Sequence, residues 1–317
     1  MVDRHPLPHL DRASLRYLYL RRVIGTAAGC CGPRLAGAAA RWLARGVFDL
    51  SPPARHVAAR RVAQAYGSRF SESQRDGLVL ASFEHFASFW AEAIFARRKL
   101  AAAGWRSHVG LTRADDLREL AGGRRGVIFV TAYLGNPAVG AYVLAQLARP
   151  LYVVVDWAAQ PLLRRWQVEL YRQPNLVPLT RAAAAHSAER ILAEGGKLFL
   201  IGEHTRPGRS GPLVSFLGAR RCFYPTVALL ACRCRVPVAV VTCRRLSHHF
   251  CFELEPAGTI EPPGPHHPDP VMEVTRGYVA AMERSILQWP QQYYWGRSSE
   301  DDGVMPSDHR TSEGTIS

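Results

Sequence analysis

The stretch from Val127 to Ala141, VIFVTAYLGNPAVGA, limits what this chain can fold into more than any other segment. Its β-branched, apolar beginning, Val127 to Val130, indicates a buried strand. Gly135 and Asn136 then permit a sharp turn, and apolar residues return at helical spacing from Val139 to Leu147. The sequence therefore predicts a strand, a turn and a helix in immediate succession.

The same alternation continues along the rest of the chain. Apolar runs predict strands at Val127–Thr131, Leu151–Val155, Leu198–Ile201, Val238–Thr242 and Phe250–Leu254. Helical spacing follows them at Val139–Leu147, Gln160–Tyr171, Ala182–Glu194, Tyr224–Cys234 and Asp269–Gln288. This order favours the α/β class, with a mixed sheet that is flanked by helices on both faces.

The segments on either side of this α/β part have a different character. We expect residues 1–100 to form basic amphipathic helices that belong to the same unit, and residues 101–298 to form the α/β domain. With 317 residues and 48% hydrophobic content, the chain can bury a core of this size. The polar tail at residues 299–317 is typical of disorder.

The formal net charge is +14, and arginine dominates the first part of the chain. Between Leu15 and Phe48, apolar residues recur at near-helical spacing with arginines among them, as in helices that lie on an anionic membrane surface. The longest charge-free run there, Val23–Pro33, is too short to span a bilayer. With no convincing secretory signal, we expect a peripheral or monotopic protein at the cytoplasmic face of the inner membrane.

Two other interpretations of the basic segment stay open. It can be an ordinary helical hairpin with solvated arginines, or its charge can attract nucleic acid. We do not expect a nucleic-acid partner, because the chain shows no recognised nucleic-acid-binding module.

The seven cysteines are odd in number and lack the spacing of a disulfide scaffold, which indicates free thiols. Cys232 and Cys234 are close in sequence, but no second ligand pair stands at zinc-finger spacing from them. We therefore expect no bound metal.

Tyr133, Glu203 and His204 each come just after a predicted strand. In open α/β sheets, ligands bind outside the carboxyl ends of the strands. We therefore expect these three side chains to face one crevice, and they are the first candidates for catalysis.

The segment Thr131 to Ala138, TAYLGNPA, resembles the motif TAHFGNWE of the late acyltransferases of lipid A biosynthesis. This lauroyl and myristoyl acyltransferase family belongs to the lysophospholipid acyltransferase superfamily. In that frame, Tyr133 stands at the position of the family's His, and Ala138 stands at the position of its Glu. The resemblance therefore implies that the His-x4-Glu dyad has been replaced.

Further blocks in the same order resemble this family from about residue 14 to residue 297. They are RHVAARRVAQAY from Arg55, the helix from Ser71 that reaches Glu92, RPLYVVVDWAAQPLLRRW from Arg149 with Gln160 in place of the usual Asn, LFLIGEHTRPGRSGPLVSFLGAR from Leu198, and PQQYYWGR from Pro290. The resemblance implies a glycerolipid acyltransferase-like fold with a membrane-associating N-terminal segment.

The resemblance also implies a reaction. It predicts transfer of a fatty acyl group from acyl carrier protein or acyl-CoA to a lipid or glycolipid acceptor, without a bound cofactor, because the donor carries its own pantetheine. If the protein is active, we expect His204 with Glu203 to be the substitute base pair. Tyr133 and the turn at Gly135 and Asn136 are expected to support the oxyanion, since a phenol with a pKa near ~10 stays protonated at neutral pH. The arginines expected to hold phosphate groups are Arg181, Arg206 and Arg209.

Two alternatives stay open from the sequence. The first alternative is a catalytically inactive member that binds lipid or partners another acyltransferase, which would explain the loss of both dyad residues. The second is altered chemistry on the same fold with an acceptor such as an amine, which needs less help from a base when it arrives deprotonated.

Overall fold

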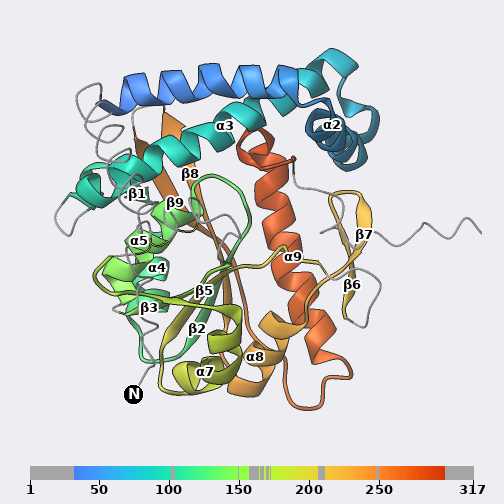
Figure 1. Cartoon of the computed structure of the whole chain (residues 1–317). Helices are drawn as coiled ribbons and strands as arrows, with labels where there is room; N and C mark the ends of the chain where they lie inside the picture. Colours follow the sequence, from blue (N-terminus) through green and yellow to red (C-terminus); the bar gives the residue numbers. More distant parts are fainter. Residues whose placement is uncertain are drawn as a thin grey trace, which may run out of the picture.

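The computed structural model of the protein describes residues 32–100, 104–148, 150–156, 164, 168, 171, 173–205, 211–247 and 250–296. From residue 109 onward strands and helices alternate, and only helices precede them within these ranges (Figure 1). The predicted mixed α/β class is confirmed. The predictions on the first 31 residues, on the tail at 299–317 and on Arg206 and Arg209 fall outside the described residues.

Seven strands form the main sheet in the order β1-β9-β8-β2-β5-β3-β4. In chain order they are β1 (Val109–Leu111), β2 (Val127–Thr131), β3 (Leu151–Val154), β4 (Leu176–Leu179), β5 (Lys197–Ile201), β8 (Val238–Ser247) and β9 (Cys251–Ile260). All neighbouring strands run parallel except β8 and β9, which are antiparallel. The carboxyl ends of β8, β2, β5, β3 and β4 therefore meet at one edge.

The central strand β2 is buried along its whole length. Val127 and Phe129 belong to the apolar cluster on one face of the sheet, whereas Ile128 and Val130 belong to the cluster on the other face. A strand covered on both faces needs apolar residues at every position, which explains the continuous VIFVT run.

Helices cover both faces of the sheet, as predicted. On one face lie α4 (Ala114–Gly122) and α5 (Pro137–Ala148), and on the other lie α7 (Arg181–Ala193), α8 (Thr226–Cys234) and α9 (Pro270–Gln288) (Figure 1). The expected helix Gln160–Tyr171 falls on residues of which only three are described.

Three α-helices precede the sheet in the part of the chain that the structure describes. Residues 32–50 are helical, and α2 (Pro52–Tyr66) and α3 (Glu72–Lys99) follow. The start of α3 is fixed by a capping box, in which the side chains of Ser71 and Gln74 each accept a backbone N–H of the other residue. Within the described ranges, none of the helices combines the length and apolar character required to cross a bilayer.

A separate hairpin of β6 (Leu213–Phe216) and β7 (Ala219–Cys222) was not predicted. Its turn lies close against α2, since a Cβ on Gly218 would meet the Gln64 carbonyl oxygen at 2.0 Å. The Glu283 carboxylate of α9 accepts the Leu217 N–H at 2.6 Å. The hairpin is therefore fastened to two helices. Short 3-10 helices lie at Gly67–Arg69, Trp105–Ser107 and Pro290–Gln292.

Candidate functional site

Residues far apart in the chain meet at the carboxyl edge of the sheet. Tyr133 lies two residues after β2, and Glu203 and His204 follow β5. β2 and β5 are paired neighbours, with Thr131 opposite Ile201. The pairing places the ends of these strands side by side, which brings the three candidates together.

The Glu203 carboxylate is buried, with 4% of the residue exposed. Its Oε1 accepts the backbone N–H of Tyr133 at 2.5 Å, and its Oε2 accepts the hydroxyl of Tyr293 at 2.5 Å. Glu203 therefore ties β5 to the segment after β2 and to the C-terminal segment of the domain.

The rings of Tyr133 and His204 lie edge to face, with their centroids 6.1 Å apart. Both residues are partly exposed. A third ring near them is the phenol of Tyr171. Burial and the neighbouring Tyr133 phenol raise the pKa of Tyr171 above its ordinary value. The edge thus combines an imidazole, the three phenols of Tyr133, Tyr171 and Tyr293, and a buried carboxylate, which can supply a proton acceptor, hydrogen-bond donors and a negative charge.

Sequence reasoning missed two members of this group. Tyr171 stood only at the end of an expected helix, and Tyr293 lay within the block PQQYYWGR. Neither position carries a local pattern that signals the site. Tyr293 reaches Glu203 across 90 residues of chain, so only the tertiary fold reveals it.

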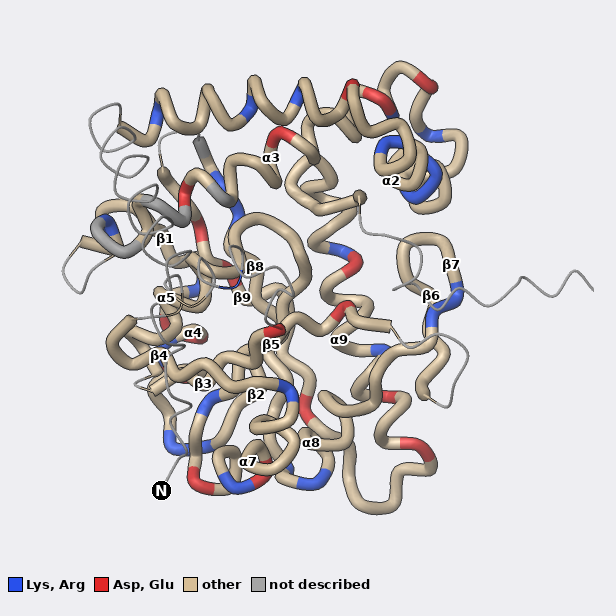
Figure 2. Tube along the Cα trace, in the orientation of Figure 1, with Lys and Arg blue, Asp and Glu red and all other residues tan. Residues whose placement is uncertain are grey.

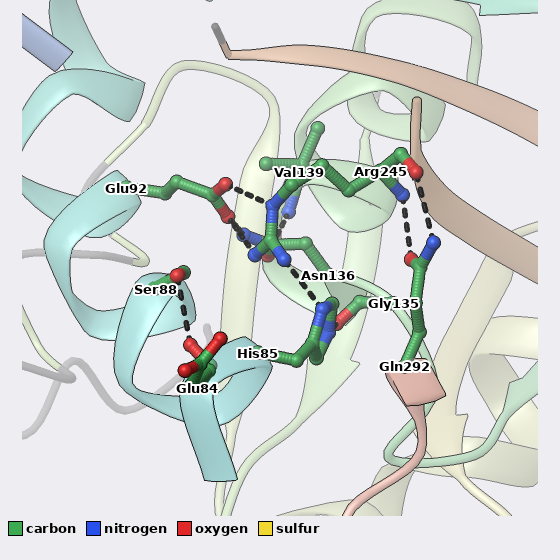
Figure 3. Close-up of polar contacts among 9 residues, drawn as sticks. All are labelled: Glu84, His85, Ser88, Glu92, Gly135, Asn136, Val139, Arg245 and Gln292. Atoms are coloured by element: carbon green, nitrogen blue, oxygen red, sulfur yellow. Dashed lines mark hydrogen bonds and ion pairs between the residues drawn. The ribbon is translucent and has the colours of Figure 1, made fainter. Parts of the chain in front are cut away.

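The turn at Gly135 and Asn136 is held by the protein itself (Figure 3). Gly135 has a φ of 65°, and an added Cβ would meet the Cys243 carbonyl oxygen at 2.0 Å, so the turn requires glycine. The Gly135 N–H donates to the Gln292 carbonyl at 2.9 Å, and the Asn136 N–H donates to the Cys243 carbonyl at 2.7 Å. These two N–H groups are therefore committed to the fold.

Asn136 also begins the helix that follows. Its Oδ1 accepts the Val139 N–H at 3.1 Å, as an N-cap does, and Pro137 is the first residue of α5. Its Nδ2 donates to Glu92 of α3 at 2.8 Å. The side chain of Asn136 thus connects the turn to two helices.

Ala138 is buried among apolar side chains between α5 and the sheet. The position that the resemblance aligns with the family's carboxylate therefore holds no ionisable group. The candidate side chains at this edge are instead Tyr133, after β2, and Glu203 and His204, after β5.

Arg181 is the first residue of α7, directly after β4 and Thr180. Its guanidinium pairs with Asp156, which follows β3, at 2.7 Å. Both side chains are more than half exposed, at 52% and 62%. Because β3 and β4 lie beyond β5 in the sheet, this pair stands at the outer end of the same edge.

Within the described residues, no group of three or more His, Cys, Asp and Glu side chains is arranged to hold a metal ion.

Residues 8–297 match the family model described as bacterial lipid A biosynthesis acyltransferase. No curated protein is similar enough to match the chain. Since the family model spans nearly the whole chain, including every strand at the carboxyl edge, this protein belongs to the bacterial lipid A biosynthesis acyltransferase family.

Proposed function

We propose that the protein moves a fatty acyl group from the thioester of acyl carrier protein or acyl-CoA to a lipid or glycolipid acceptor. The observation that carries the proposal is the meeting of Tyr133, His204 and Glu203 at the carboxyl edge of a sheet in this acyltransferase family. In this account His204 is the base and Tyr133 is the hydrogen-bond donor.

The reaction follows from these roles. The acceptor hydroxyl oxygen attacks the thioester carbonyl carbon while the His204 imidazole takes the hydroxyl proton. The Tyr133 phenol donates a hydrogen bond to the oxyanion that forms. Collapse of this intermediate breaks the carbon–sulfur bond, and the imidazolium returns its proton to the departing thiolate. The negative charge of nearby Glu203 favours the transient imidazolium.

Arg181 and, by resemblance, Arg206 and Arg209 are proposed to hold phosphate groups of the substrates. A guanidinium offers a planar set of donors that suits phosphate oxygens. The exposed ion pair of Arg181 with Asp156 supports this assignment, because a surface pair of this kind is weak and can exchange one anionic partner for another.

The test is transfer from acyl carrier protein with a labelled acyl chain to a total lipid extract. His204→Ala and Tyr133→Phe are compared with His186→Ala, a matched change of an exposed histidine on α7. We expect transfer by the parent and by His186→Ala, and loss of about 100-fold in His204→Ala. Transfer at the parent rate by His204→Ala contradicts the assignment of the base.

One observation favours the second candidate function, a catalytically inactive member that binds lipid. Gly135 and Asn136 give their backbone N–H groups to the fold, so the turn offers an oxyanion little support beyond the Tyr133 side chain. Under this alternative, the parent transfers no label but still binds acyl carrier protein or lipid, which the same preparation tests by co-sedimentation with lipid vesicles.

We also propose that the protein rests on the cytoplasmic face of the inner membrane through the helix at residues 32–50. Its exposed apolar side chains are Leu35, Trp42, Leu43, Val47 and Leu50. They lie on one side of the helix, whereas Ala44 is buried on the side toward the body. Basic residues recur on this helix and on α2, and Asp49 is the single acidic residue from 32 to 66 (Figure 2). Apolar insertion beside arginines suits an anionic lipid surface.

Flotation with vesicles that contain an anionic phospholipid tests the membrane proposal. Val47→Ser, combined with Trp42→Ser, should reduce binding, because both changes remove apolar area from the helix. Leu246→Ser is the control, since Leu246 is exposed to the same 53% as Val47 but lies on β8. Equal binding by both variants contradicts the proposal.

A further inference from the structure

Four polar side chains from three parts of the chain surround the turn after β2 (Figure 3). His85 and Glu92 lie on α3, Arg245 lies on β8, and Gln292 ends the last 3-10 helix. We call these four side chains the clamp.

The ion pair at the centre of the clamp is buried. Arg245 grips Glu92 with two parallel contacts, from Nε to Oε1 and from Nη2 to Oε2, the latter at 2.8 Å. The side chains of Arg245 and Glu92 are only 7% and 11% exposed. A bidentate, buried contact fixes the orientation of both groups.

His85 extends this pair to the turn. Nη1 of Arg245 can only donate, so it donates to Nδ1 of His85, and the ring proton is therefore on Nε2. Nε2 in turn donates to the Gly135 carbonyl oxygen at 2.9 Å. One ionic group thus determines the tautomer of the histidine that holds Gly135.

The clamp reaches the turn at two more points. The second link is the Asn136 amide, which donates to Glu92 at 2.8 Å. The third is Gln292. Its side chain exchanges two hydrogen bonds of 2.8 Å with the backbone of Arg245, and its backbone carbonyl accepts the Gly135 N–H. Gly135 is therefore held through both its carbonyl and its N–H, and Asn136 is held through its side chain.

Tyr133 lies between the clamp and Glu203. Its carbonyl accepts the N–H of Tyr294, two residues after Gln292, at 3.0 Å, and its own N–H donates to Glu203. The backbone on both sides of this tyrosine is thus fixed by groups that do not themselves belong to the ring cluster of Tyr133, Tyr171 and His204.

We propose that His85, Glu92, Arg245 and Gln292 are positioning residues that hold the Tyr133 phenol in the orientation the reaction requires. They act through the turn and touch no reacting atom. A buried ion pair adds little stability beyond an apolar pair of the same volume, so a gain in orientation accounts for its presence here. The activity part of this inference rests on the proposed acyl transfer, whereas its structural part does not.

The first test is the double substitution Glu92→Leu with Arg245→Met, which removes both charges together and leaves neither one buried alone. The matched control is Arg233→Ala with Glu189→Ala, which removes an exposed ion pair between α8 and α7 that includes no clamp residue. Two readouts are compared: kcat and KM for acyl transfer, and amide hydrogen exchange in a peptide that contains Gly135 and Asn136.

We expect the first double variant to melt cooperatively, with exchange at the turn faster by about tenfold or more and exchange in β5 unchanged. Its kcat should fall about 10- to 100-fold with KM nearly unchanged, because the loss is one of orientation. The control should match the parent in both readouts. A merely structural role would instead lower the melting temperature and raise exchange in β5 as much as at the turn.

His85→Ala keeps the inference testable if the double variant does not fold, because it removes a neutral side chain and only one link to the turn. It should raise exchange at the turn and lower kcat less than the double variant does. Turn exchange and kcat within about twofold of the parent in a folded variant would overturn the inference. If the parent transfers no acyl group, the proposed function fails, and the exchange readout alone decides on the clamp.

Discussion

Two buried cations stand at opposite ends of the same sheet, and they are satisfied in different ways. Lys197, at the amino end of β5, is 2% exposed and donates to three backbone carbonyls, those of Gly123, Arg125 and Gly195, at 2.6–2.9 Å. Arg245, near the carboxyl end of β8, is 8% exposed and is met by a carboxylate and an imidazole.

The difference follows what each cation holds. The carbonyls around Lys197 belong to the two loops that lead into β2 and β5, so neutral acceptors suffice to close those loops. Arg245 instead holds, through Glu92 and His85, a turn whose neighbour Tyr133 is a candidate for chemistry, and its directional contacts are an ion pair with Glu92 and a hydrogen bond to His85. Lys197 thus joins two loops at the amino edge, whereas Arg245 fixes the directions of the Glu92 and His85 side chains near the carboxyl edge.

Among the variants that test this contrast, Glu92→Gln should cause the largest loss of unfolding free energy. It leaves the Arg245 charge buried without its counter-ion, which costs about 3–5 kcal/mol of unfolding free energy. Urea unfolding followed by circular dichroism measures the change. Glu84→Gln on the same helix is the control, and a loss of less than about 1 kcal/mol for Glu92→Gln would break the comparison.

Lys197→Met should cost less, about 2–3 kcal/mol, because it leaves buried carbonyls without a donor but creates no buried charge. The same unfolding experiment measures it. We expect the exchange of the amides at Gly135 and Asn136 to stay at the parent rate, since the change lies at the other end of the sheet. A cost larger than that of Glu92→Gln would reverse the order that the two environments predict.

Tyr66 provides a neutral donor to a single carbonyl, that of Leu287, at 3.0 Å. Tyr66→Phe should cost about 1 kcal/mol at neutral pH. Burial raises the pKa of Tyr66 from 10.0 to about 12, so between these values the unfolded chain releases a proton that the folded chain retains. The contribution of Tyr66 is therefore fully present below pH 10 and is lost as the pH rises to 12. Parent and Tyr66→Phe should converge in stability across that window, and a difference independent of pH would contradict the prediction.

Arg45→Ala should have the smallest effect, below about 1 kcal/mol. Its partner Glu84 lies on α3, but the arginine side chain is 64% exposed, so solvent screens the pair. High salt should leave the unfolding free energy of this variant nearly equal to that of the parent. If Arg45→Ala lost as much unfolding free energy as Lys197→Met, solvent exposure would not explain the difference between exposed and buried cations.

The central strands were predictable because burial on two faces demands continuous apolar runs. β2 was predicted with its observed bounds, and β3 and β5 to within one residue. β8 and β9, of ten residues each, were predicted too short. β9 continues through Glu255 and Pro256, residue types that sequence patterns place in loops. The pairing of β8 with β9 shifts register next to this proline, because Val240 pairs with Gly258 and Val241 with Pro256, which leaves Ala257 as the extra residue of β9.

Edge elements escaped prediction for a related reason. β4 reads LVPL, and its Pro178 is tolerated because the strand lies at the end of the sheet. β1 has three residues, and the β6–β7 hairpin carries Arg220 and Arg221 within a strand. None of them has the apolar alternation that distinguishes a strand in sequence.

Part of the candidate site could be predicted and part could not. The position of Tyr133, Glu203 and His204 after strands was sufficient to predict that they meet, because strand ends converge in a parallel sheet. The roles of these residues remain predictions. The clamp gave no such signal, since His85 and Arg245 are separated by 160 residues and each is ordinary in its local sequence.

The most direct test of the account is the rate of labelled acyl transfer by His204→Ala measured beside Lys197→Met. We expect His204→Ala to keep the parent's melting temperature but to lose about 100-fold in rate, whereas Lys197→Met should lose stability but keep its rate per folded molecule. Parent activity that survives in His204→Ala, or an equal loss of rate in both variants, would contradict the claim that the carboxyl edge carries the reaction.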